Sequence, residues 1–199
     1  VCTAVIARRF ADYKRHIMPF QDMPFFESLL RRKRIQLVIA GKPHYHHKEM
    51  VNRWNEIYGR SLYLPGLAVL PNYELDQSKL LKAGSDLWIQ MPRYPQEACG
   101  TSWMSAFLDG SLVLTTPGTG MDQIPQELYF LFGQDVSGPD VGEQDFRDLQ
   151  AFKSKLLNVL ELFYHEPDIW YGRTLAAKQY AEHYLVGERM LQDYHEKLY

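Results

Sequence analysis

The stretch that decides the fold runs from residue 93 to residue 110 and reads Arg93-Tyr-Pro-Gln-Glu-Ala-Cys-Gly-Thr-Ser-Trp-Met-Ser-Ala-Phe-Leu-Asp-Gly110. It follows an apolar run at residues 86–90 that predicts a buried strand. Small residues then lead into apolar residues at helical spacing, and Asp109-Gly110 predicts a turn before another strand at residues 112–114. This order of strand, glycine-containing loop, helix and strand is typical of a phosphate-binding turn, because a helix start leaves backbone N–H groups free.

The composition is that of a globular protein, with 199 residues, 46% apolar residues and 23% charged residues. The net charge of -2 argues against nucleic-acid or membrane-surface binding through the overall field. No apolar run is long enough to cross a bilayer. The two cysteines are too few for a disulfide framework, which fits a reducing, cytoplasmic compartment. Because the chain starts at Val1 inside an expected strand, we expect a fragment of a longer protein, and this leaves export open.

Strands and helices are expected to alternate along the first 142 residues. The apolar runs predict strands at residues 1–7, 35–40, 66–70, 86–90, 112–114 and 128–132. Short helices are expected at residues 24–33, 47–58 and 75–83, and loops at residues 115–125 and 133–142. This pattern predicts an α/β fold with a Rossmann-like parallel sheet of about six strands. Residues 143–199 are expected to form a C-terminal helical segment that packs on domain 1–142 and breaks near Pro167 and Gly187.

Basic residues follow the first predicted strand. Arg8, Arg9, Lys14 and Arg15 suit a phosphate or a pyrophosphate, although a solvated basic loop is the alternative. The loops at residues 8–15, 41–47, 71–73 and 93–105 all follow predicted strands. They should therefore meet at the carboxyl edge of the sheet, where such sheets bind ligands.

Other polar and aromatic residues carry weaker signals. His44, His46 and His47 lack a second cluster at zinc-ligand spacing, so no metal site is expected, and one of them is left as a ligand contact. Glu97 suits sugar hydroxyls or a positive charge at a reacting carbon, with helix capping as the alternative. Three tryptophans are expected in the core: Trp54, Trp88 and Trp103.

Four short motifs follow one another along the chain. They are Arg8-Arg9-Phe-Ala-Asp-Tyr13-Lys14-Arg15, Gly41-Lys42-Pro43-His44, Pro71-Asn72-Tyr73, and Pro92-Arg93-Tyr94-Pro95-Gln96-Glu97-Ala98-Cys99-Gly100-Thr101-Ser102-Trp103-Met104-Ser105. With these motifs and its closing helix at residues 190–199, the chain resembles the C-terminal, donor-binding domain of α-glucan phosphorylases, especially their bacterial, maltodextrin-type branch. The resemblance covers essentially the whole chain.

The resemblance implies one half of a B-type glycosyltransferase fold, whose N-terminal acceptor domain is absent from this sequence. It implies that Arg9 and Lys14 hold the reacting phosphate. It further implies that Gly100 and Thr101 hold a phosphate at the helix start and that Glu97 contacts the sugar. The rest of the expected donor-binding set is Arg8, Ser102, Ser105, Tyr73 and His44.

Ser105 departs from the family, because the phosphorylases carry there the lysine that binds pyridoxal phosphate. A hydroxyl cannot form an imine, so no covalent pyridoxal phosphate is expected. In related transferases that use nucleotide sugars, this position carries a glutamate, eight residues after the first, that contacts the ribose. The following Asp-Gly-Trp-type segment is also altered, to Pro117-Gly-Thr-Gly120.

The leading expectation is a donor-binding domain of a retaining glycosyltransferase that uses a nucleotide diphosphate sugar without pyridoxal phosphate. Its acceptor would be a glycan or a protein, as in glycosylating toxins and effectors, and would bind through the absent N-terminal domain. The alternatives are a catalytically inactive glycan- or partner-binding module and a working α-glucan phosphorylase.

Overall fold

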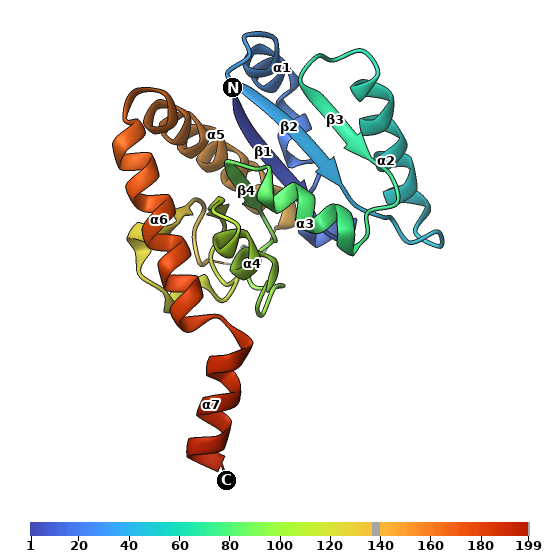
Figure 1. Cartoon of the computed structure of the whole chain (residues 1–199). Helices are drawn as coiled ribbons and strands as arrows, with labels where there is room; N and C mark the ends of the chain where they lie inside the picture. Colours follow the sequence, from blue (N-terminus) through green and yellow to red (C-terminus); the bar gives the residue numbers. More distant parts are fainter. Residues whose placement is uncertain (137–139, 199) are drawn as a thin grey trace.

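The computed structural model describes residues 1–136 and 140–198 of the chain (Figure 1). Its centre is a six-stranded parallel sheet in the order β3-β2-β1-β4-β5-β6. The strands are β1 (Cys2–Ala7), β2 (Ile35–Ala40), β3 (Leu67–Leu70), β4 (Leu87–Gln90), β5 (Leu112–Thr115) and β6 (Phe130–Leu131). The strand order reverses between β1 and β4, and in doubly wound sheets ligands bind beyond the carboxyl ends of the strands at such a point. The predicted Rossmann-like architecture is confirmed.

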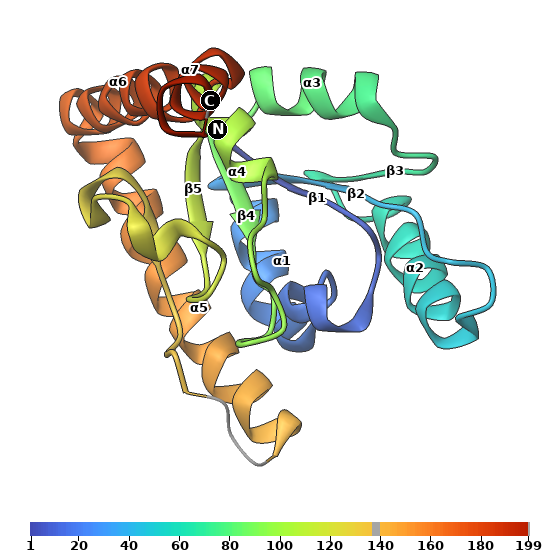
Figure 2. The same ribbon diagram turned by 90° about the horizontal axis from the view of Figure 1, so that it is seen from below.

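Helices cover both faces of the sheet. They are α1 (Met23–Arg31), α2 (Lys48–Ser61), α3 (Leu75–Ala83), α4 (Ser102–Leu108), α5 (Val141–His165), α6 (Pro167–Tyr184) and α7 (Gly187–Leu198). Figure 2 shows α1, α2 and α5 on one face of the sheet and α3, α4 and α6 on the other. Short 3-10 turns lie at Asp12–Lys14, Met18–Asp22, Met121–Gln123 and Gln126–Leu128.

The predicted elements agree with the structure in kind and order. The final strand is shorter than expected, because a 3-10 turn occupies residues 126–128 before β6. The predicted helix breaks are confirmed: Pro167 opens α6 and Gly187 opens α7. A proline suits the first turn of a helix, where its missing N–H has no partner to lose. The loop expected at residues 133–142 lies partly outside the described residues, and the domain boundary at residue 142 stays a prediction.

The core lies on both faces of the central strands. All four residues of β4 and of β5 are buried, which explains why the first three residues of each strand are apolar. Trp88 and Trp103 are 0% and 1% exposed and Trp54 is 8% exposed, so the prediction that the tryptophans belong to the core is confirmed.

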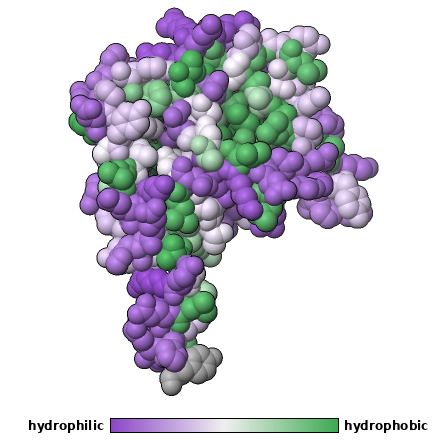
Figure 3. All heavy atoms as spheres, in the orientation of Figure 1, coloured by the Kyte–Doolittle hydropathy of each residue, from purple (hydrophilic) through white to green (hydrophobic). Residues whose placement is uncertain are grey.

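Helix α7 stands away from the body of the protein (Figure 1). None of its described residues is buried, and apolar side chains gather along one side of it (Figure 3). The exposed apolar residues on α7 are Met190, Leu191, Tyr194 and Leu198. Across residues 1–136 and 140–198, no helix combines the length and the apolar content that crossing a membrane requires.

Candidate functional site

Arg8 lies directly after β1 and is buried, with 8% of its surface exposed. Its Nη2 donates to Oε1 of Gln90, the last residue of β4, at 2.9 Å. Its Nε and Nη1 are also buried, and neither finds a hydrogen-bond partner within the described residues. Burial lowers the pKa of Arg8 to about 10, while the charge of Glu97 opposes that shift. Arg8 therefore stays charged at neutral pH, with two donors unpaired.

Lys14 and Glu97 form an ion pair beside Arg8, although 83 residues separate them in the sequence. Their side chains are 9% and 11% exposed. The Lys14 ammonium also lies 4.9 Å from the centre of the Tyr13 ring, a cation–π contact. The structure thus brings together Lys14, which was expected to bind phosphate, and Glu97, which was expected to contact the sugar.

The glycine turn lies next to this pair. A Cβ atom on Gly100 would come within 3.3 Å of Gln90 Oε1 and 4.0 Å of Glu97 Oε1, so the missing side chain leaves space in the cluster. The Gly100 N–H donates to the Thr119 carbonyl at 3.0 Å. A phosphate at this turn would have to displace that bond or use the amides that follow it.

Helix α4 begins one residue after Thr101, which is exposed. Ser102 is the first residue of α4, and its carbonyl accepts a 3.2 Å hydrogen bond from the Ser105 hydroxyl. Ser102 and Ser105 are both partly exposed, so their hydroxyls lie near the surface at the helix start.

Tyr73 approaches the cluster from the loop after β3. Its hydroxyl donates to Ser78 Oγ at 2.8 Å. Burial raises the pKa of Tyr73, while the hydrogen bond to Ser78 and the charge of Arg8 oppose that shift.

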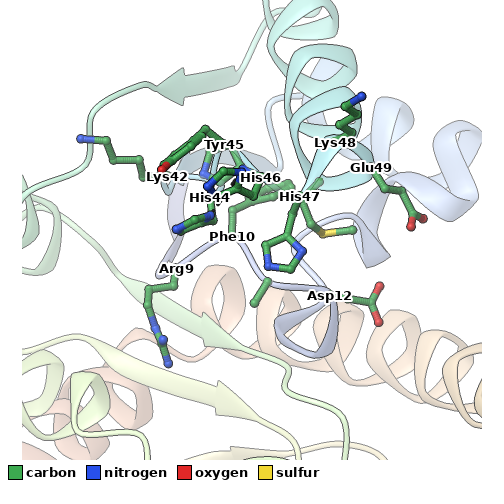
Figure 4. A pocket seen from close by; sticks show the side chains of 13 residues that line it. Arg9, Phe10, Asp12, Lys42, His44, Tyr45, His46, His47, Lys48 and Glu49 are labelled. Atoms are coloured by element: carbon green, nitrogen blue, oxygen red, sulfur yellow. Dashed lines mark hydrogen bonds between the residues drawn. The ribbon is translucent and has the colours of Figure 1, made fainter.

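Arg9 and His44 lie apart from this cluster, on a neighbouring cavity of about 870 Å³. Both side chains are exposed, and Figure 4 shows Arg9 pointing away from the histidine loop. The His44 ring stacks on Tyr45 and on His46, with ring centres 4.8 Å and 5.3 Å apart. In the part of the chain that the structure describes, no three His, Cys, Asp or Glu side chains gather as a metal-ligand set.

The alternative of a solvated basic loop is wrong for Arg8, Lys14 and Arg15, which are buried, whereas Arg9 is exposed. Arg15 also differs from the expected phosphate ligand. Its Nε donates to the Met91 carbonyl at 2.7 Å and its Nη1 pairs with Asp148 at 2.7 Å. These partners occupy the guanidinium within the protein and leave it a structural role.

Two residues at the site, Gln90 and Asp145, were not predicted from the sequence. Gln90 is fully buried and bridges Arg8 and the Thr115 hydroxyl, to which its Nε2 donates at 3.1 Å. A polar residue at the end of an apolar strand was its only signal. Asp145, at the start of α5, pairs with Arg15 and Arg93 and has no signal in the sequence, because its partners lie far away along the chain.

Arg8, Lys14, Glu97, Gly100 and Gln90 together can bind an anion beside a hydroxyl-rich ligand. Two cations supply charge, one carboxylate accepts hydrogen bonds, and the glycine allows close approach of a ligand to the backbone. A doubly wound parallel sheet with this set at the ends of β1 and β4 defines a Rossmann-like domain with a candidate site for a phosphorylated ligand.

The chain is similar in sequence to parts of several known proteins. The chain is 34% identical over 200 residues to a protein of Methanocaldococcus jannaschii described as uncharacterized, covering 99% of this chain and 37% of that protein. It is 27% identical over 201 residues to the maltodextrin phosphorylase of Thermococcus litoralis, covering 97% of this chain and 24% of the enzyme. It is 37% identical over 120 residues to the glycogen phosphorylase of Mycobacterium tuberculosis, covering 58% of this chain and 14% of the enzyme.

No protein-family model matches the chain. The chain spans at most 37% of the length of these three relatives. The chain is therefore similar to part of maltodextrin and glycogen phosphorylases, which is consistent with a phosphorylase-like domain.

Proposed function

We propose that this chain is the C-terminal, donor-binding domain of a retaining glycosyltransferase that uses a nucleotide diphosphate sugar and no pyridoxal phosphate. The observation that carries the proposal is the buried Arg8 guanidinium, whose Nε and Nη1 have no partner among the described residues. A buried charged donor without a partner is costly, and an anionic ligand at this position would remove that cost.

The site residues would act on the leaving group and on the sugar. Arg8 and Lys14 would neutralise the diphosphate as its bond to the anomeric carbon breaks, which is preorganised electrostatic stabilisation. A diphosphate at Lys14 would compete with Glu97, and the released carboxylate would then be free for the sugar hydroxyls. Arg9 and His44, on the neighbouring cavity, would contact the outer part of the donor.

Covalent pyridoxal phosphate does not fit these residues. Ser105 carries a hydroxyl, which cannot form an imine, and its Oγ donates to Ser102 within α4. Lys14 is the basic side chain beside Glu97, and its ammonium is already paired. The proposed transfer therefore uses no step on that cofactor.

Calorimetry with UDP- and GDP-sugars tests the proposal. The wild-type protein should bind at least one of them, and Lys14→Met should weaken that binding about tenfold or more, as expected for losing a charge-assisted contact. Lys178→Met is the matched control, because Lys178 is an exposed lysine on α6 that belongs neither to the Arg8 cluster nor to the lining of the neighbouring cavity. If neither this chain nor a longer protein that contains it binds any nucleotide sugar, the proposal is wrong.

A catalytically inactive glycan- or partner-binding module is the second candidate. The observation in its favour is that Lys14 pairs with Glu97 and the Gly100 amide pairs with Thr119, so both groups are satisfied without a ligand. This candidate predicts binding of maltodextrin without binding of nucleotide sugars. A working phosphorylase, the activity named for two of the relatives, instead predicts phosphate-dependent release of glucose 1-phosphate from maltodextrin and absorbance from bound pyridoxal phosphate.

A further inference from the structure

Lys14 stands on a single 3-10 turn, Asp12–Lys14, and not on a strand or a long helix. The next residue, Arg15, has φ 54° and ψ 40°, a left-handed conformation that non-glycine residues seldom adopt. One short turn does little by itself to fix the direction of a long lysine side chain. Contacts from other parts of the chain must hold the turn in place.

The segment after β4 supplies these contacts. The Arg93 N–H donates to the Tyr13 carbonyl at 2.7 Å. In return, Arg15 donates to the carbonyls of Met91 and Pro92 at 2.7 Å and 3.1 Å. The turn that carries Lys14 is thus joined on both sides to the segment that leads to Glu97.

Arg93 completes the clamp with its side chain. Its Nη1 pairs with Asp12 at 3.1 Å, on the turn itself. Its Nε and Nη2 bind the two carboxylate oxygens of Asp145 at 3.0 Å and 2.7 Å, a bidentate pair that fixes the plane of the guanidinium. The Arg93 side chain is 7% exposed, whereas that of Asp12 is 55% exposed.

We propose that Arg93, held in place by Asp145, is a positioning residue for Lys14. It acts through the turn at residues 12–14 and not through contact with the donor. This role rests on the proposed function, in which Lys14 binds the donor phosphate. Helix α5 would then set the anion affinity of a site that it does not enter.

A double-mutant cycle with inorganic pyrophosphate tests the role. Arg93→Gln should weaken pyrophosphate binding about tenfold when Lys14 is present, because Lys14 no longer points into the site. In the Lys14→Met background the same change should have little further effect. Equal weakening in both backgrounds would overturn the proposal, because Arg93 would then act independently of Lys14.

Two further variants separate the role of Arg93 from a general loss of structure. Asp12→Asn weakens the exposed half of the clamp, together with the 3.4 Å pair between Asp12 and Arg53, and should give the same non-additive effect at smaller size, even if Arg93→Gln fails to fold. Lys153→Gln is the matched control, because it breaks a different ion pair between α5 and the rest of the chain, the one with Asp22. It should leave pyrophosphate binding unchanged, and weakening by this variant would contradict the specific role of Arg93.

Lysine reactivity gives a readout that needs no ligand. Lys14 is buried and paired, so acetic anhydride should modify it slowly in the wild-type protein, as peptide mass spectrometry can measure. Arg93→Gln should accelerate its acetylation several-fold while that of Lys153 stays unchanged. If Arg93→Gln accelerates the acetylation of Lys14 but the wild-type protein does not bind pyrophosphate, the positioning role is supported and the proposed function is wrong. Pyrophosphate binding with unchanged acetylation in Arg93→Gln would sink the positioning role alone.

Discussion

At the scale of single residues, the pair of Lys14 and Glu97 is the central feature of the site. Both side chains are nearly buried, so removing either one leaves the other charge without compensation. An incoming phosphate offers Lys14 an alternative partner with a larger negative charge. In the proposed function, Glu97 would therefore compete with the ligand for Lys14, and the affinity of the site would depend on the cost of separating the pair.

Glu97→Gln is expected to strengthen the binding of inorganic pyrophosphate several-fold. The change removes a carboxylate that both occupies Lys14 and repels the anion. Calorimetry at constant ionic strength measures the effect. Glu56→Gln is the control for overall charge, because Glu56 is exposed on α2 and pairs with Arg60. Weaker pyrophosphate binding by Glu97→Gln would show that Glu97 supports the anion site and does not compete in it.

His16 makes the stability of the fold depend on pH. The ring is 2% exposed, its Nε2 lies 3.2 Å from the Arg8 carbonyl oxygen, and burial lowers its pKa from 6.5 to about 3. Between pH 6.5 and pH 3, His16 therefore binds a proton in the unfolded chain but not in the folded chain. The stability that neutral His16 contributes is complete above pH 6.5 and is lost as the pH falls toward 3.

Urea unfolding at pH 7 and pH 5 should reveal this loss. From His16 alone, the free energy of unfolding should fall by about 2 kcal/mol over this interval. His16→Gln should flatten the dependence by that amount, since glutamine does not titrate. An equally steep dependence in the variant would assign the acid sensitivity to other groups.

At the scale of elements, the site depends on how closely the loop after β2 crosses the end of β1. A Cβ atom on Gly41 would lie 2.6 Å from the carbonyl oxygen of Arg8, a contact with backbone that cannot simply move aside. Phe10 and Pro43 continue the approach as an isolated parallel bridge. The loop therefore packs directly over the backbone that carries Arg8.

Gly41→Ala should destabilise the fold by about 1–3 kcal/mol, because the added methyl group forces the loop away from β1. Gly59→Ala is the matched control, since Gly59 lies within α2 and has nothing within 4 Å of its would-be Cβ. That change should be neutral or stabilise by up to about 1 kcal/mol through helix propensity. Thermal or urea unfolding compares the two, and a Gly41→Ala variant as stable as Gly59→Ala would refute the close approach.

At the scale of the whole molecule, α5 links the carboxyl ends of the strands to their amino ends. Asp145 near its start binds Arg93 at the carboxyl edge. Tyr164 near its end accepts from the Cys2 N–H at 3.2 Å and donates to the Arg34 carbonyl at 2.9 Å, at the amino edge. Helix α6 covers β5 on the opposite face, whereas α7 buries no described residue. The stability of the molecule is therefore unevenly distributed along the C-terminal helices.

Hydrogen exchange followed by mass spectrometry should show this difference. Amides of α7 should exchange fastest among the helices, because a 12-residue helix without packing is marginal in water. Amides of α5 should exchange with the core strands. Deleting residues 187–199 should leave the melting temperature of the rest unchanged. Slow exchange in α7, or a lower melting temperature after the deletion, would contradict this picture.

The sequence by itself determined the order of elements, the parallel sheet and the edge where the site lies. Continuous apolar runs alternating with amphipathic ones leave little choice of architecture, and parallel strands necessarily place their carboxyl ends on one edge. The motifs also placed Arg8, Lys14 and Glu97 beyond strand ends. Proline and glycine marked where the C-terminal helices break, because their backbone preferences act locally.

Only the tertiary structure decided which side chains meet. It paired Lys14 with Glu97, gave Arg15 to the carbonyls after β4 and to Asp148, and separated Arg9 from the buried cluster. It also revealed the contacts of Gln90, whose only local signal is a polar side chain at a strand end, and of Asp145, which has no local signal. The physical reason is that these ion pairs and hydrogen bonds join residues as far as 52 to 133 positions apart, and their choice depends on burial and geometry that exist only after the chain has folded.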